Sequence, residues 1–123
     1  LIEGTSILNL RLILASSAAK VTIERVFKRF NLHQYFTHIV SGEDFPDSKP
    51  HPAIFEYAAS LSIAPKENCI VIEDSTNGIR AAKAAGIFCV GYNSENSKLQ
   101  DLSLADVVVE NLDELSFEII SQY

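Results

Sequence analysis

The sequence contains no methionine and no tryptophan, and only two of its 123 residues are cysteine. Cys69 and Cys89 each lie inside an apolar run, without the CxxC or Cys/His spacing of a metal site, so we expect two reduced, buried thiols. Apolar runs as long as the roughly 18 residues of a membrane span are also missing, which excludes a spanning helix in this sequence. Because residue 1 is leucine and no methionine follows, we expect the natural chain to begin upstream.

Basic residues are fewer than acidic residues in this sequence. The sequence has 10 Lys+Arg against 16 Asp+Glu, a formal net charge of −6, and such an acidic surface repels the phosphate backbone of nucleic acids. It does not begin with a basic segment followed by the apolar stretch of an export signal, so we expect a cytoplasmic protein without a membrane anchor. With 47% hydrophobic and 21% charged residues, the composition is that of one ordinary globular domain.

Short apolar segments alternate with segments of helical spacing along the chain. This alternation predicts βαβ units and a parallel sheet of the α/β class, with strands buried on both faces and their carboxyl ends at one edge. Apolar residues at helical spacing predict helices over 23–30, 54–61 and 78–85, and a last short helix after Asn111. The predicted strands are Leu10–Ala15, Thr37–Ser41, Cys69–Glu73, Phe88–Tyr92 and Asp106–Val109.

Polar side chains follow the first three predicted strands, where a parallel sheet brings strand ends together. Hydroxyls follow the first strand, an ammonium group follows the second and two adjacent carboxylates follow the third. Carboxylate oxygens suit Mg²⁺, a lysine neutralises phosphoryl oxygens, and hydroxyl and backbone N–H groups cradle an anion. Together these groups favour phosphoryl transfer. In chain order, the candidates are Ser16, Ser17, Lys49, Glu73, Asp74, Ser75 and Asn77.

A purely structural role is open for each candidate taken alone. Ser16 or Ser17 could cap a helix that begins near Ala19, and Lys49 could be a solvated surface lysine. Asp74 or Ser75 could likewise cap the helix after the third strand. Their order and spacing together, rather than any one residue, point to a shared site.

Three segments, LILASSA, SKPHPAIF and VIEDSTNGIRAAKAAG, resemble the second, third and fourth motifs of the haloacid dehalogenase superfamily. The resemblance extends from about Leu10 to Leu115 and is strongest to the β-phosphoglucomutase-like phosphatase and phosphomutase branch. It implies a three-layer Rossmann-like α/β fold. It also implies a Mg²⁺-dependent phosphohydrolase or phosphomutase that acts on a small phosphorylated metabolite such as a sugar phosphate.

The resemblance also implies roles for individual residues. Ser16 would hydrogen-bond the transferring phosphoryl group, with Ser17 as a neighbour that could donate a further hydrogen bond. Lys49 would hold the nucleophile and the phosphoryl oxygens, so that both Ser16 and Lys49 count as catalytic and as phosphate-binding.

The fourth motif would supply the metal site. Glu73 and Asp74 would help to hold Mg²⁺, and Ser75 and Asn77 would support them.

Two parts of the superfamily pattern are missing from this sequence: the Asp-x-Asp nucleophile motif of the central strand and the cap domain that selects the substrate. We therefore expect residues 1–123 to be the C-terminal portion of a core domain, inactive alone, whose aspartyl-phosphate forms on an upstream Asp.

In the superfamily, the missing strand lies between the first and third predicted strands. We expect its slot to be filled by an upstream fragment, by a segment of a second copy, or by closure of the two strands on each other. The alternative function is a non-catalytic binding or assembly module that retains the fold.

Overall fold

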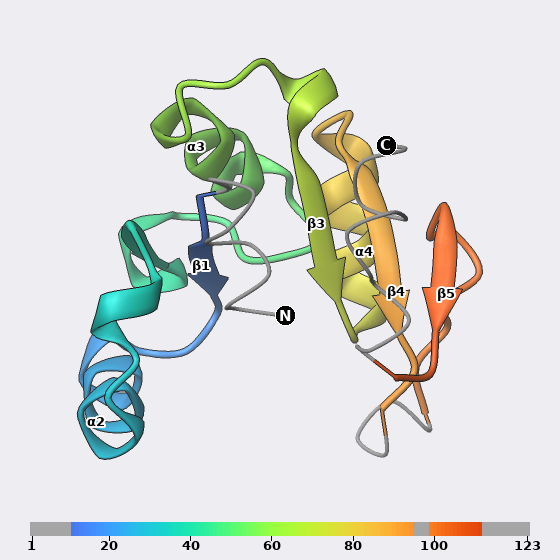
Figure 1. Cartoon of the computed structure of the whole chain (residues 1–123). Coiled ribbons are helices and arrows are strands. Elements are labelled where there is room, and N and C mark those ends of the chain that lie inside the picture. Colours follow the sequence, from blue (N-terminus) through green and yellow to red (C-terminus); the bar gives the residue numbers. More distant parts are fainter. Residues whose placement is uncertain (1–10, 95–98, 112–123) are drawn as a thin grey trace.

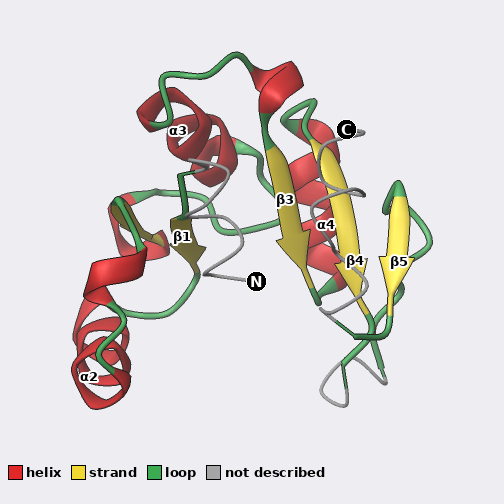
Figure 2. Ribbon diagram, viewed as in Figure 1, coloured by secondary structure: helices red, strands yellow, loops and turns green. Residues whose placement is uncertain are grey.

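The computed structural model describes residues 11–94 and 99–111, which form parallel β-strands connected mainly by helices (Figures 1 and 2). The strands are β1 (Ile13–Ser16), β2 (His38–Ser41), β3 (Ile70–Glu73), β4 (Phe88–Tyr92) and β5 (Val107–Val109). The α-helices are α2 (Lys20–Phe30), α3 (Ala53–Leu61) and α4 (Thr76–Ala84). Among these helices, none combines the length and the apolar character needed to cross a bilayer.

The observed elements confirm the predicted α/β class and every strand within the described residues. Each predicted strand overlaps an observed one, and β4 has the predicted bounds. Helix α4 ends just before Gly86, whose φ of 76° is the left-handed conformation that glycine adopts at helix ends. The helix predicted after Asn111 lies outside the described residues.

The described strands form two parallel sheets, one of β1 and β2 and the other with the order β3–β4–β5. Ala15 pairs with Val40 in the first sheet, and Val71 pairs with Cys89 in the second. Figure 1 shows β1 and β3 pointing in the same direction. Closure of β1 directly onto β3 is therefore not what occurs, because these strands belong to separate sheets.

The core lies where α3 and α4 pack against the strands. Ile79, Ala81 and Ala82 of α4 are fully buried, and the small side chains of the two alanines let the helix pack closely against the sheet. Helix α3 contributes Ile54 and Phe55 to the same cluster. This packing joins the two sheets through their helices, since α3 contacts β1 and β2 while α4 contacts β3 and β4.

Two predictions about burial need correction. Strand β4 is buried as expected, but Ile72 of β3 is 44% exposed and all four residues of β1 are only partly buried, because these strands lie on either side of the division between the sheets. Both cysteines are free thiols, but only Cys89 is fully buried; Cys69 is partly buried at the start of β3. Burial, with the nearby charges of Glu73 and Asp106, raises the pKa of Cys89 to about 12.

Candidate active site

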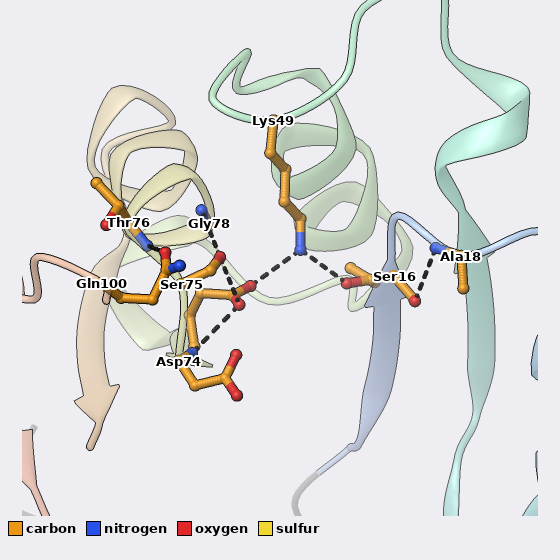
Figure 3. Close-up of polar contacts among 10 residues, drawn as sticks. Ser16, Ala18, Lys49, Asp74, Ser75, Thr76, Gly78 and Gln100 are labelled. Atoms are coloured by element: carbon orange, nitrogen blue, oxygen red, sulfur yellow. Dashed lines mark hydrogen bonds and ion pairs between the residues drawn. The ribbon is translucent and has the colours of Figure 1, made fainter. Parts of the chain in front are cut away.

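Lys49 connects the ends of the two sheets (Figure 3). Its Nζ donates to the backbone oxygen of Ala15 in β1 at 3.2 Å and to Glu73 Oε2 at the end of β3 at 2.9 Å. The side chains of Lys49 and Glu73 are only 10% and 13% exposed. The ammonium group also lies 4.8 Å from the centroid of the Phe55 ring. Lys49 is therefore not a solvated surface lysine but a nearly buried cation at the carboxyl edge of both sheets.

The Glu73 carboxylate organises the turn that follows β3. Its Oε1 accepts hydrogen bonds from the backbone N–H of Asp74 and from the Ser75 hydroxyl, both at 3.2 Å, while Oε2 faces Lys49. Ser75 Oγ in turn accepts from the N–H of Gly78 at 3.0 Å and caps α4. Of the two capping residues that the sequence left open, the cap is thus Ser75.

Ser16 is the last residue of β1 and leads into a loop that Ser41 at the end of β2 helps to hold in place. Ser16 Oγ accepts from the N–H of Ala18 at 3.1 Å, so its own proton remains available for donation to a ligand. The buried hydroxyl of Ser41, at the end of β2, donates to the Ala18 carbonyl at 2.8 Å. Helix α2 begins after Ala19 without a side-chain cap, so neither Ser16 nor Ser17 has the capping role that the sequence allowed.

A small hollow of about 50 Å³ lies beside Lys49. Ser17 is exposed and reaches this hollow from the β1–α2 loop, whereas Lys49 reaches it from the loop before α3. Gly42 allows the close approach of these loops, since a Cβ there would lie 3.2 Å from Ser17 Cα. The hollow is lined by Ser17, Gly42, Phe45, Asp47, Ser48, Lys49 and Ile54.

The described residues do not by themselves form a complete metal site. Within residues 11–94 and 99–111, no group of three or more His, Cys, Asp or Glu side chains is placed to hold a metal ion. Glu73 is already engaged with Lys49, while Asp74 Oδ2 accepts a long hydrogen bond, 3.5 Å, from Ser94 Oγ. Asn77 is exposed on the first turn of α4. The oxygen donors that are present suit Mg²⁺ in chemical type.

Sequence reasoning missed three residues that shape this site. Ser41 had a readable signal, a hydroxyl at the end of an apolar strand. Gly78 has no side chain whose chemistry would mark it in the sequence, although a Cβ there would overlap Cγ, Cδ and Oε2 of Glu73. Gln100 had no signal, because its partner Thr76 is 24 residues away in the sequence.

Gly78→Ala should therefore displace the Glu73 side chain from Lys49. Alanine favours a helix over glycine by about 1 kcal/mol, but a broken buried ion pair costs about 3–5 kcal/mol. We expect a net loss of about 2–4 kcal/mol in the free energy of unfolding, measured by urea denaturation of the full-length protein.

The matched control for this substitution is Gly86→Ala. A Cβ at Gly86 meets nothing within 4 Å, but the φ of 76° strains alanine, so we expect a loss of about 1–2 kcal/mol without any change at the site. A stabilising effect of Gly78→Ala would show that Glu73 does not lie over this glycine.

Known proteins match this chain in sequence and in fold. Residues 2–92 match the sequence model of the haloacid dehalogenase-like hydrolases. The chain is 36% identical over 103 residues to the 5-amino-6-(5-phospho-D-ribitylamino)uracil phosphatase of Arabidopsis thaliana, covering 84% of this chain and 27% of that protein. It is 35% identical over 105 residues to hexitol phosphatase B of Escherichia coli K12, covering 84% and 47%.

A solved structure agrees with these sequence relatives. The β-phosphoglucomutase of Clostridium difficile superposes with a TM-score of 0.83 at 28% identity, covering 98% of this chain and 52% of the other. The chain thus spans about half or less of the length of these proteins. The chain belongs to the haloacid dehalogenase-like hydrolase family.

Proposed function

We propose that the full-length protein is a Mg²⁺-dependent phosphohydrolase or phosphomutase that acts on a small phosphorylated metabolite such as a sugar phosphate. The observation that carries this proposal is the nearly buried ammonium group of Lys49, held between Ala15 O and Glu73 Oε2 at the end of β1, where Ser16 follows Ala15. A fixed cation at this edge offsets the negative charge that develops on a transferring phosphoryl group. The phosphatase relatives support the same reaction class.

Each candidate residue then has a role in the proposed site. Ser16 donates its hydroxyl proton to a phosphoryl oxygen. Ser17 lines the small hollow next to Lys49. Lys49 neutralises phosphoryl oxygens and orients the nucleophile. Glu73 holds Lys49 and the following turn, which Ser75 caps.

Asp74 is the proposed Mg²⁺ ligand of this chain, with Glu73 beside it and Asn77 in support. When bound, Mg²⁺ supplies positive charge that stabilises the phosphoryl oxygens during transfer. Because the described residues provide fewer than three acidic or imidazole ligands at one place, the remaining ligands have to come from elsewhere in the protein or from water.

We further propose that an upstream strand with an Asp-x-Asp sequence fills the slot between β1 and β3. The support is that these two strands point the same way yet belong to separate sheets (Figure 1), and that the relatives are about twice as long or longer. Its first Asp would carry the aspartyl-phosphate. On this proposal residues 1–123 alone do not release phosphate. Cytoplasmic location stays a prediction from the sequence.

Phosphate release by the full-length protein tests the proposal. We expect hydrolysis of at least one member of a panel of sugar phosphates, its loss in EDTA and its recovery with added Mg²⁺. Conversion of a sugar phosphate into its isomer without release of phosphate would instead identify a mutase. No turnover of any member of the panel, together with no thermal shift in phosphate or Mg²⁺, would favour the non-catalytic module.

A further inference from the structure

The turn that carries Asp74 is also held from the side away from Ser16 (Figure 3). The backbone N–H of Thr76 donates to Gln100 Oε1 at 2.8 Å, and the N–H of Asp101 donates to Thr76 Oγ1 at 2.7 Å. Thr76 is the first residue of α4, whereas Gln100 and Asp101 belong to the segment between β4 and β5. The two hydrogen bonds therefore join this segment to the helix in both directions.

Gln100 is exposed, but the chain that follows it is firmly anchored. Leu102 packs against the core, and the absence of a side chain at Gly91 makes room for Leu102 and Ala105. Asp106 accepts from Lys83 Nζ at 2.7 Å and from the N–H of Cys89 at 2.8 Å, and the Lys83 ammonium group lowers the pKa of this carboxyl. The packing of Leu102 and the hydrogen bonds of Asp106 thus hold in place the backbone that carries Gln100.

The same contacts use the hydrogen-bond donors at the start of α4. The N–H of Thr76 is taken by Gln100 and the N–H of Gly78 by Ser75 Oγ. These donors therefore bind protein oxygens rather than an anion, and they fix the direction in which the preceding turn leaves β3. Just after β4, where the segment between β4 and β5 begins, Ser94 Oγ donates a hydrogen bond to Asp74 Oδ2.

We propose that Gln100 and Thr76 are positioning residues for Asp74. By holding the first residue of α4, they fix the turn that presents the Asp74 carboxylate and so raise the affinity of the site for a divalent cation. Contacts that orient a metal ligand typically change metal affinity by about 10–100-fold. This inference rests on the proposed function, because it requires Asp74 to be a Mg²⁺ ligand.

Mg²⁺ titration of the full-length protein by calorimetry, without substrate, tests the proposal. We expect Gln100→Ala and Thr76→Val each to raise the Kd for Mg²⁺ about tenfold. Thr76→Ser retains the acceptor oxygen and should bind like the wild type. Leu99→Ala is the matched control, because this neighbouring side chain is 97% exposed. Amide hydrogen exchange at Thr76 should be faster in Gln100→Ala, which reports the lost contact directly.

The outcomes separate this inference from the proposed function. Equal Kd values for the wild type and both Gln100→Ala and Thr76→Val would overturn the positioning role while leaving the Mg²⁺ site intact. A loss of affinity in Thr76→Ser as large as in Thr76→Val would also overturn it, because the retained hydroxyl should suffice. A wild-type protein that does not bind Mg²⁺ would overturn the proposed metal site itself.

Discussion

Lys49→Met should lower the free energy of unfolding of the full-length protein by about 3–5 kcal/mol and remove its phosphate release. The substitution leaves Glu73, whose side chain is 13% exposed, as a nearly buried carboxylate without its cation. It also removes the donor to Ala15 O that connects the two sheets. Urea denaturation measures the first effect, and turnover of the substrate found in the panel measures the second.

Two variants show whether the ion pair is responsible. Lys66→Met removes a lysine whose ion pair with Glu56 is long, 4.0 Å, and about half exposed, so it should cost less than about 1 kcal/mol. The double variant Lys49→Met/Glu73→Gln leaves no unpaired buried charge and should recover most of the lost stability without recovering turnover. If Lys49→Met alone is as stable as Lys66→Met, the pairing with Glu73 does not stabilise the fold.

Asp74→Asn should reduce Mg²⁺-dependent turnover by at least about 100-fold. A metal ion contributes several kcal/mol to stabilisation of the transition state, and each 1.36 kcal/mol corresponds to about tenfold in rate. Without metal, the variant should be as stable as the wild type or slightly more stable, because the substitution relieves repulsion from the adjacent Glu73. Steady-state kinetics across a range of Mg²⁺ concentrations, together with thermal unfolding in EDTA, measure both effects.

The control for Asp74→Asn is Asp44→Asn, which makes the same chemical change at an exposed ion pair with Lys20. We expect this variant to keep its turnover and to lose less than about 1 kcal/mol of stability. Unchanged turnover in Asp74→Asn would remove Asp74 from the proposed metal site.

Much of the fold was readable because its signals are local. Runs such as CIVIE and FCVGY have the length and the β-branched or aromatic content of strands, and Gly86 marks the end of α4. The rule that parallel strands share one carboxyl edge then places the ends of β1 and β3 on the same side, where Lys49 bonds to both Ala15 O and Glu73 Oε2. The order and spacing of the candidate residues along the chain therefore predict a shared site.

Other features depend on which segments pack together, and no local pattern contains that information. The burial of Cys69 was overestimated: this residue comes just before β3 and is only partly buried against the core. The exposure of Ile72 follows from the division between the sheets, which a single strand sequence cannot show.

Local sequence patterns were sufficient to predict the α/β order of elements, the approximate positions of the strand ends and the kinds of chemical group found there. The contacts between those groups became visible only in the folded chain, where Ser75 rather than Asp74 caps α4 and Glu73 holds Lys49. The hydrogen bond between Gln100 and Thr76 is likewise seen only in the folded chain. Helix and strand signals act over a few neighbouring residues, whereas the contacts of Glu73 with Lys49 and of Gln100 with Thr76 each join groups 24 residues apart in the sequence, which only folding brings together.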